Sequence, residues 1–303
     1  MAKLLIFYLN LSCLVLLVLL GACTPDNRQN EVENAVVGLS VDAYSNLSPT
    51  EQKAMSEKLL QIGMSFYGQG SPKSMEFIEQ AIMLDSTNAA AWRELSIPYL
   101  KRGYAHQWHE LIDKAVYYDP ETWMGYRATM KLYFYRDFEG AIADFNATDT
   151  ITPNFTDYPQ GQSVDYMRGL CYMGLGQYAT AIDWYNKYIA EVTEEQGEKW
   201  VDVYAFLYKG ITFNYLQQYD SALLNLNKGL SYYPNSADMH YHMAKVHLAM
   251  QRPNAALESW QKGLTLFDQG NYQQRPYVEV LEQLYDTDFT ALHKNILAAK
   301  AKR

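Results

Sequence analysis

The chain has 303 residues, of which 49% are hydrophobic and 14% aromatic, and 26 of them are tyrosines. This composition can support a continuous core and excludes global disorder. The formal net charge is −9 and no basic stripe runs along the sequence, which argues against a nucleic-acid backbone as ligand.

Residues 1–22 have the pattern of an export signal. Lys3 supplies a positive start, and a largely apolar run extends from Leu4 to Leu20. Small residues, Gly21 and Ala22, then precede Cys23. This stretch resembles the lipobox of bacterial lipoproteins, which ends in an obligatory cysteine. The resemblance implies a mature chain that begins at Cys23 and is lipidated there with several acyl chains; an uncleaved membrane anchor is the alternative.

The same resemblance implies a place in the bacterial cell envelope. Thr24 stands where an aspartate would, in enterobacterial sorting, retain the protein at the inner membrane. We therefore expect a lipid-anchored protein on the outer membrane that faces the periplasm. Residues 23–47 begin with a polar run and are interpreted as a flexible tether.

A helical repeat is predicted to begin at residue 48 and to extend to residue 270. Ser48, Pro49 and Glu51 combine a serine cap, a proline at the first helical position and a glutamate three residues after the cap. An eight-residue phrase then occurs four times, and its fourth position is always alanine: Ala141, Ala181, Ala222 and Ala256. Small residues at a fixed place let helices approach closely, which is typical of stacked helical hairpins.

These features resemble the tetratricopeptide repeat (TPR), a family of helix-turn-helix units. Trp92, Leu95 and Tyr99 match the marks of the first helix, and Pro120, Pro153 and Pro234 fall where second helices should stop. The resemblance implies an all-α fold, a right-handed superhelical array of about six TPR-like hairpins. C-terminal capping helices are expected within residues 271–303, at 276–285 and 287–303.

Two stretches make the repeat longer than the family length. They lie near residues 154–162 and 192–199, and they are rich in turn-forming or charged residues. We expect both to be loops that bulge from the array without breaking it.

No catalytic, phosphate-binding or metal-binding motif is present in the sequence, so we predict neither enzymatic activity nor a cofactor nor a metal site. Histidines share two predicted helices, but acidic ligands near them are few, and packed or surface histidines are expected: His106, His109, His240, His242 and His247. Cys171 is predicted to be a packed thiol, and no intramolecular disulfide is possible in the expected mature chain.

The TPR resemblance also implies a concave face lined by the first helix of each hairpin. Carried onto this sequence residue by residue, it gives an aromatic partner-binding groove: Trp123, Tyr126, Tyr133, Phe134, Tyr166, Tyr204, Tyr215 and Tyr241. Tyrosine and tryptophan combine a large contact area with a polar tip. The alternative interpretation is core packing between helices, because a shift of one position exchanges groove for core.

We therefore expect a non-catalytic, lipid-anchored scaffold that binds envelope proteins or peptide segments. It would contact the membrane through its anchor and would bind no nucleic acid. The alternative is a glycan- or peptide-binding lipoprotein that uses the same tyrosine-rich groove. An enzyme is the third hypothesis, and no motif supports it.

Overall fold

The computed structural model describes residues 47–302 except Asn154, and this part of the chain contains helices and loops but no strand. The expected signal segment 1–22, the lipidation site Cys23 and almost all of the expected tether 23–47 lie outside the described residues. Within the described part, every helix is too short or too polar to cross a membrane.

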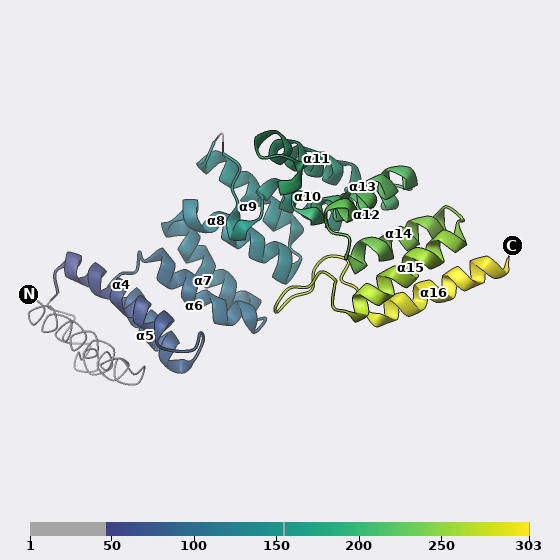
Figure 1. Cartoon of the computed structure of the whole chain (residues 1–303). Coiled ribbons are helices and arrows are strands. Elements are labelled where there is room, and N and C mark those ends of the chain that lie inside the picture. The colour runs from purple at the N-terminus through teal and green to yellow at the C-terminus, as the bar shows by residue number, and fades with distance from the viewer. Residues whose placement is uncertain (1–46, 154, 303) are drawn as a thin grey trace, which may run out of the picture. The chain divides into compact units, whose positions relative to one another are not determined.

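Contacts divide the chain after Tyr118 into two compact units. The helices of the first unit are α4 (Pro49–Ser65), α5 (Pro72–Leu84), α6 (Ala89–Lys101) and α7 (Ala105–Tyr118). Those of the second unit are α8 (Pro120–Met130), α9 (Phe138–Ile151), α10 (Val164–Gly174), α11 (Tyr178–Glu195), α12 (Val203–Tyr215), α13 (Tyr219–Tyr232), α14 (Ala237–Ala249), α15 (Pro253–Asp268) and α16 (Asp286–Ala301), labelled in Figure 1.

Successive helices pair as hairpins. The first unit has two pairs, α4 with α5 and α6 with α7, and the second has four, from α8 with α9 to α14 with α15. Helix α16 packs against α15 and α14. The prediction of an all-α fold with about six hairpins is confirmed.

The predicted helix boundaries follow from local chemistry. At the start of α4, the Ser48 backbone N–H donates to the Glu51 carboxylate (2.8 Å), and the Ser48 hydroxyl accepts from the Glu51 N–H. Pro120 follows the end of α7 and occupies the first turn of α8. Proline thus ends one helix and begins the next.

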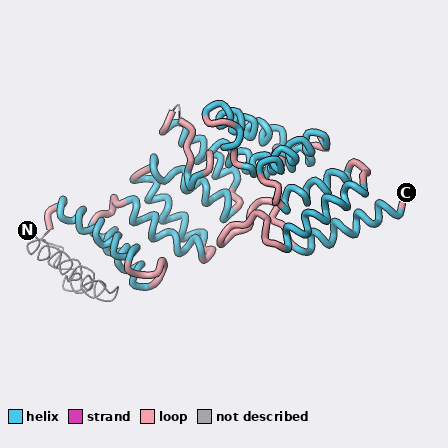
Figure 2. The backbone as a smooth tube through the Cα atoms, in the orientation of Figure 1, coloured by secondary structure: helices cyan, strands magenta, loops and turns pink. Residues whose placement is uncertain are grey.

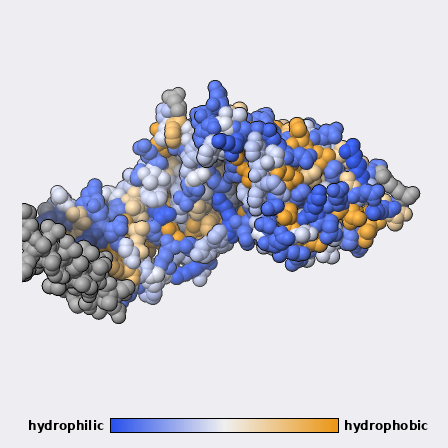
Figure 3. Space-filling model, viewed as in Figure 1, coloured by the Kyte–Doolittle hydropathy of each residue, from blue (hydrophilic) through white to orange (hydrophobic). Residues whose placement is uncertain are grey.

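The repeated alanines lie at the centre of the packing. All four are fully buried, and the large residue four positions later is also buried in each copy: Phe145, Tyr185, Leu226 and Trp260. Residues four positions apart lie on the same face of a helix, so each repeated pair enters the close-packed interior together. On the face drawn in Figure 3, hydrophobic residues are interspersed with hydrophilic ones.

One of the two predicted capping helices is wrong. The helix predicted at residues 287–303 corresponds to α16, which ends at Ala301, but residues 276–285 are irregular and belong to a segment between α15 and α16, drawn as loop in Figure 2. Tyr277 and Glu282 have left-handed backbone conformations (φ 71° and 55°), which interrupt a helix. We call residues 269–285 the strap.

The two predicted loop insertions differ from each other. The first is irregular, with a short 3-10 turn at Pro159–Gly161. The second is only partly a loop, because α11 continues to Glu195 before Gly197 (φ 97°) ends it and a 3-10 turn follows at Glu198–Trp200. The expectation of two loops is therefore corrected for the second insertion.

Candidate functional site

The strap lies against the first helices of the hairpins in the second unit, a surface that we call the first-helix face. The Tyr208 hydroxyl of α12 is 2.5 Å from the Gln273 side-chain oxygen and 3.0 Å from the Leu281 carbonyl oxygen. On α14, the Asp238 carboxylate accepts the Gln273 backbone N–H at 2.9 Å. Side chains of this face therefore bind the backbone of an irregular segment.

A local irregularity after α8 positions a further contact. Residues Lys131–Tyr135 form a π-helical turn, which ends at Arg136 in the left-handed conformation (φ 53°). Single π-helical turns inside α-helices frequently occur at functional positions. From this position the Arg136 guanidinium donates to the carbonyl oxygens of Glu279 (2.8 Å) and Val280 (3.1 Å).

Arg275 of the strap is held by a ring and an amide. Its guanidinium lies 3.6 Å from the centre of the Tyr133 ring and donates to the Gln162 side-chain oxygen at 2.6 Å. The Tyr133 hydroxyl donates to the same oxygen at 2.8 Å. Burial raises the pKa of Tyr133 to about 12, so the hydroxyl keeps its proton and remains a donor at neutral pH.

The structure places the eight predicted groove residues in three environments. Tyr126, Tyr133, Tyr166 and Tyr241 are buried, whereas Trp123, Phe134 and Tyr204 are half-buried. Tyr215 is 39% exposed. Their role in binding a partner stays a prediction.

The structure therefore does not show an open aromatic groove. Two elements, the strap and α16, cover aromatic residues of the first-helix face. The strap covers the first-helix face at Tyr133 and at Tyr215, whose hydroxyl hydrogen-bonds Glu282. Helix α16 covers Tyr241 by placing the Phe289 ring 5.0 Å from it.

A cavity of about 480 Å³ remains where the strap meets this face. Tyr178 and Tyr215 stack on one another there, with ring centres 4.9 Å apart. Glu279, Glu282 and Tyr285 of the strap also line the cavity.

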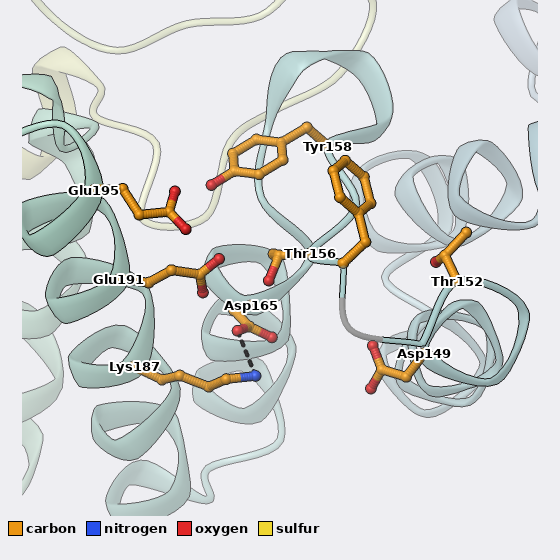
Figure 4. A pocket seen from close by; sticks show the side chains of 9 residues that line it. Asp149, Thr152, Thr156, Tyr158, Asp165, Lys187, Glu191 and Glu195 are labelled. Atoms are coloured by element: carbon orange, nitrogen blue, oxygen red, sulfur yellow. Dashed lines mark ion pairs between the residues drawn. The ribbon is translucent and has the colours of Figure 1, made fainter.

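A second cavity, of about 340 Å³, lies between the first insertion and α11. Figure 4 shows the carboxylates of Glu191 and Glu195 and the hydroxyl of Tyr158 pointing into the same space. In the same cavity, Lys187 forms an ion pair with Asp165 at 2.7 Å.

Tyr158 also lines a third cavity, of about 200 Å³. Its walls include Tyr166, Tyr188, Trp200 and Asp202. Sequence reasoning identified only Tyr166 among these residues. The two departures from the repeat length were a signal for part of this cavity, because Tyr158, Gln162 and Gln196 of the insertions contribute to its walls.

Cys171 and His242 are packed in the interior, whereas His106 lies exposed on the surface. Burial raises the pKa of the Cys171 thiol and lowers the pKa of His242 well below its usual value. Among residues 47–302, Asn154 aside, no group of three histidine, cysteine or acidic side chains could hold a metal ion. The expected absence of catalysis stays a prediction.

Comparisons with known proteins agree with this architecture. The sequence profile of the tetratricopeptide repeat matches residues 166–190, which comprise most of α10 and α11. No curated protein matches the sequence.

Several solved structures share the fold at low sequence identity. A tetratricopeptide repeat protein from Parabacteroides merdae ATCC 43184 is 19% identical, with a TM-score of 0.58 over 80% of this chain and 99% of its own. PilW, described as a widely conserved type IV pilus biogenesis factor, is 18% identical, with a TM-score of 0.56 over 70% of this chain and 94% of its own.

The Cut9–Hcn1 hetero-tetramer of the APC/C contains a chain 15% identical, with a TM-score of 0.55 over 89% of this chain. The match spans only 51% of that chain, about half its length. The protein therefore contains one segment that matches the tetratricopeptide repeat, within a fold of stacked helical hairpins that it shares with these structures.

Proposed function

We propose that this protein is a non-catalytic, lipid-anchored scaffold of the bacterial cell envelope, which binds segments of other proteins through its second unit. One observation carries the binding role: the first-helix face already holds an irregular peptide segment, the strap. It does so with donors from Arg136 and Tyr208 to strap carbonyls and an acceptor from Asp238 to a strap N–H. Backbone recognition of this kind can accept segments of many sequences.

Two exposed aromatic side chains of the second unit offer contact area to a partner. Tyr215 is 39% exposed beside the strap, and Trp200 is 64% exposed on the second insertion. Aromatic side chains contribute much of the binding energy of protein interfaces, because they bury large areas with few rotatable bonds.

The proposed location in the cell envelope is supported by the sequence. The apolar run from Leu4 to Leu20, followed by Gly21-Ala22-Cys23, supports export and acylation of the cysteine. A chain with several acyl groups stays on its membrane, because each buried methylene contributes about 0.8 kcal/mol.

Photocrosslinking in cells tests the scaffold. A photoreactive residue replaces Tyr215 or Trp200, and in a control chain it replaces Leu224, which is 71% exposed on α13. We expect one protein, identified by mass spectrometry, to crosslink from the first two positions and not from the third, and to bind the purified chain. Absence of a protein crosslink, together with saturable binding of an oligosaccharide, would instead favour the glycan-binding alternative.

A further inference from the structure

The third cavity of the second unit is built by the two insertions rather than by the regular repeat. Tyr158 and Gln162 come from the first insertion, and Gln196 and Trp200 from the second. Tyr166 of α10 and Tyr188 of α11 close the cavity from behind. We call this cavity the tyrosine cage.

One buried polar group in the tyrosine cage has no partner. Tyr166 is 1% exposed, and its hydroxyl makes no hydrogen bond within the described part of the chain. Leaving a buried hydroxyl unsatisfied costs about 1–3 kcal/mol, so such groups are uncommon and call for an explanation. Tyr166 lines the cage, so a ligand that reaches this hydroxyl can supply the missing hydrogen bond.

The lining of the cage also includes a carboxylate. Asp202 accepts the Tyr204 N–H at 3.0 Å, and its own N–H donates to the Tyr188 hydroxyl at 3.0 Å. Burial raises the pKa of Asp202, while the Tyr204 N–H, the Gln162 amide and the Arg275 guanidinium lower it. An additional cation in the cage would stabilise the ionised carboxylate.

The charges around the tyrosine cage leave an excess of negative charge. Asp149 and Asp165 are matched by Arg168 and Lys187, with ion pairs of 2.6–2.7 Å. Arg275 lies near Asp202, and the Lys199 ammonium lies 5.7 Å from the centre of the Trp200 ring.

Two further carboxylates, Glu191 and Glu195, line the adjoining cavity beside Tyr158, and neither forms an ion pair within residues 47–302, Asn154 aside. Their charges act on the Tyr158 side chain shared by the two cavities.

Aromatic walls with nearby carboxylates favour a cation, because ring faces carry partial negative charge. The molecule uses this contact elsewhere: Arg275 lies 3.6 Å from the centre of the Tyr133 ring, and the Lys187 ammonium 5.0 Å from that of Trp184. The cage volume of about 200 Å³ is below that of sites for drug-sized molecules and suits one long side chain.

We propose that the tyrosine cage takes the cationic end of a lysine or arginine side chain from a basic, extended segment of a partner protein. The Tyr166 hydroxyl and the Asp202 carboxylate accept its N–H donors, and Glu191 and Glu195 face the next basic residue of the segment. This inference rests on the proposed scaffold function and names the chemistry of its partner.

The test uses the full chain, purified in detergent, and follows the Trp200 indole N–H by NMR. Three probes are short Gly-Ser peptides whose two central residues are both lysine, both arginine or both the neutral acetyl-lysine. The fourth probe is an oligosaccharide. We expect saturable shifts of the Trp200 signal with the lysine or arginine peptide, and dissociation constants at least about tenfold weaker with acetyl-lysine.

Three variants separate binding from folding. Asp202→Asn keeps the shape of the side chain and is expected to weaken binding about tenfold. Tyr166→Phe removes only an unpaired hydroxyl, so it should leave the fold intact and weaken binding several-fold. Tyr185→Phe is the matched control, a buried tyrosine outside the cage, and should bind normally.

Equal binding of the acetyl-lysine peptide, no shift of Trp200 with any peptide, or binding of the oligosaccharide alone would overturn the proposal. Unaltered binding in Asp202→Asn would also overturn it. The two tests distinguish failure of this proposal from failure of the scaffold function. If only this proposal fails, a partner without basic residues still crosslinks from Tyr215 while the cage stays unoccupied.

Discussion

Asp238 connects the protonation of one residue to the position of the strap. Its side chain is 3% exposed and accepts the Gln273 N–H, and burial raises its pKa to about 6. The ordinary value is about 4, so the folded state binds this proton more tightly than the unfolded state. The stability linked to Asp238 is therefore full below about pH 4 and is lost as the pH rises through about 6.

The substitution Asp238→Asn should remove this pH dependence, because asparagine keeps an oxygen for the Gln273 N–H but does not titrate. Relative to the variant, we expect the natural chain to lose about 2–3 kcal/mol of unfolding free energy between pH 4 and pH 7. Urea denaturation of both proteins at several pH values measures the difference. If the unfolding free energies of the two proteins change in parallel with pH, Asp238 is not the group responsible for the pH dependence.

Gly169 faces a ring that cannot move aside. A Cβ at this position would lie 2.4 Å from Cε1 of Tyr185, a fully buried side chain. We expect Gly169→Ala to destabilise the protein by about 1–3 kcal/mol, because overpacking forces strain into the core. Gly68→Ala is the control, since a Cβ there meets nothing within 4 Å. Thermal unfolding that shifts equally in both variants would contradict this explanation.

At the scale of elements, Tyr208 anchors the strap. Tyr208→Phe removes the hydroxyl that lies near the Leu281 carbonyl oxygen and the Gln273 side-chain oxygen. These strap oxygens then lose their hydrogen-bond donor. We expect a loss of about 1–3 kcal/mol and faster hydrogen exchange at the Gln273 amide. Tyr166→Phe, which removes an unpaired hydroxyl, should not destabilise the protein and should leave the exchange rate of the Gln273 amide unchanged. Unchanged exchange in Tyr208→Phe would mean that other contacts hold the strap.

The hairpins could be predicted from sequence, whereas the strap could not. Alanines at a fixed place determine which helices approach closely, and this is a local, repeated signal. Residues 276–285 also have apolar positions at spacings that fit a helix, but three of them are buried as an irregular segment: Val280, Leu281 and Leu284. There, contacts with elements distant in sequence decide the backbone, and local pattern does not reveal them.

The candidate site, too, could be predicted only in part from the sequence. The TPR resemblance led to aromatic residues of the first helices, and the strap contacts several of them, including Tyr133 and Tyr215. Their exposure could not be predicted, because the cover comes from residues that follow α15. The tyrosine cage depends on two insertions that are separated in sequence by α10 and most of α11.

For the whole molecule, we propose that location depends on Cys23. The acyl chains expected there would hold the protein on a membrane, and the described helices offer no span that could do so instead. Cys23→Ser should therefore abolish labelling with an alkyne-bearing palmitate, whereas Cys13→Ser, within the expected signal segment, should leave it unchanged.

Membrane sedimentation alone would not distinguish the lipidated chain from the uncleaved alternative, because a chain that retains Leu4 to Leu20 can also stay on a membrane. The mass of the N-terminal peptide distinguishes them. A lipidated chain begins at Cys23 with acyl chains attached, and Cys23→Ser accumulates as an unlabelled precursor with residues 1–22 still present. A natural chain that carries residues 1–22 and no label would contradict the lipoprotein assignment, while leaving the fold and the tyrosine cage as they are.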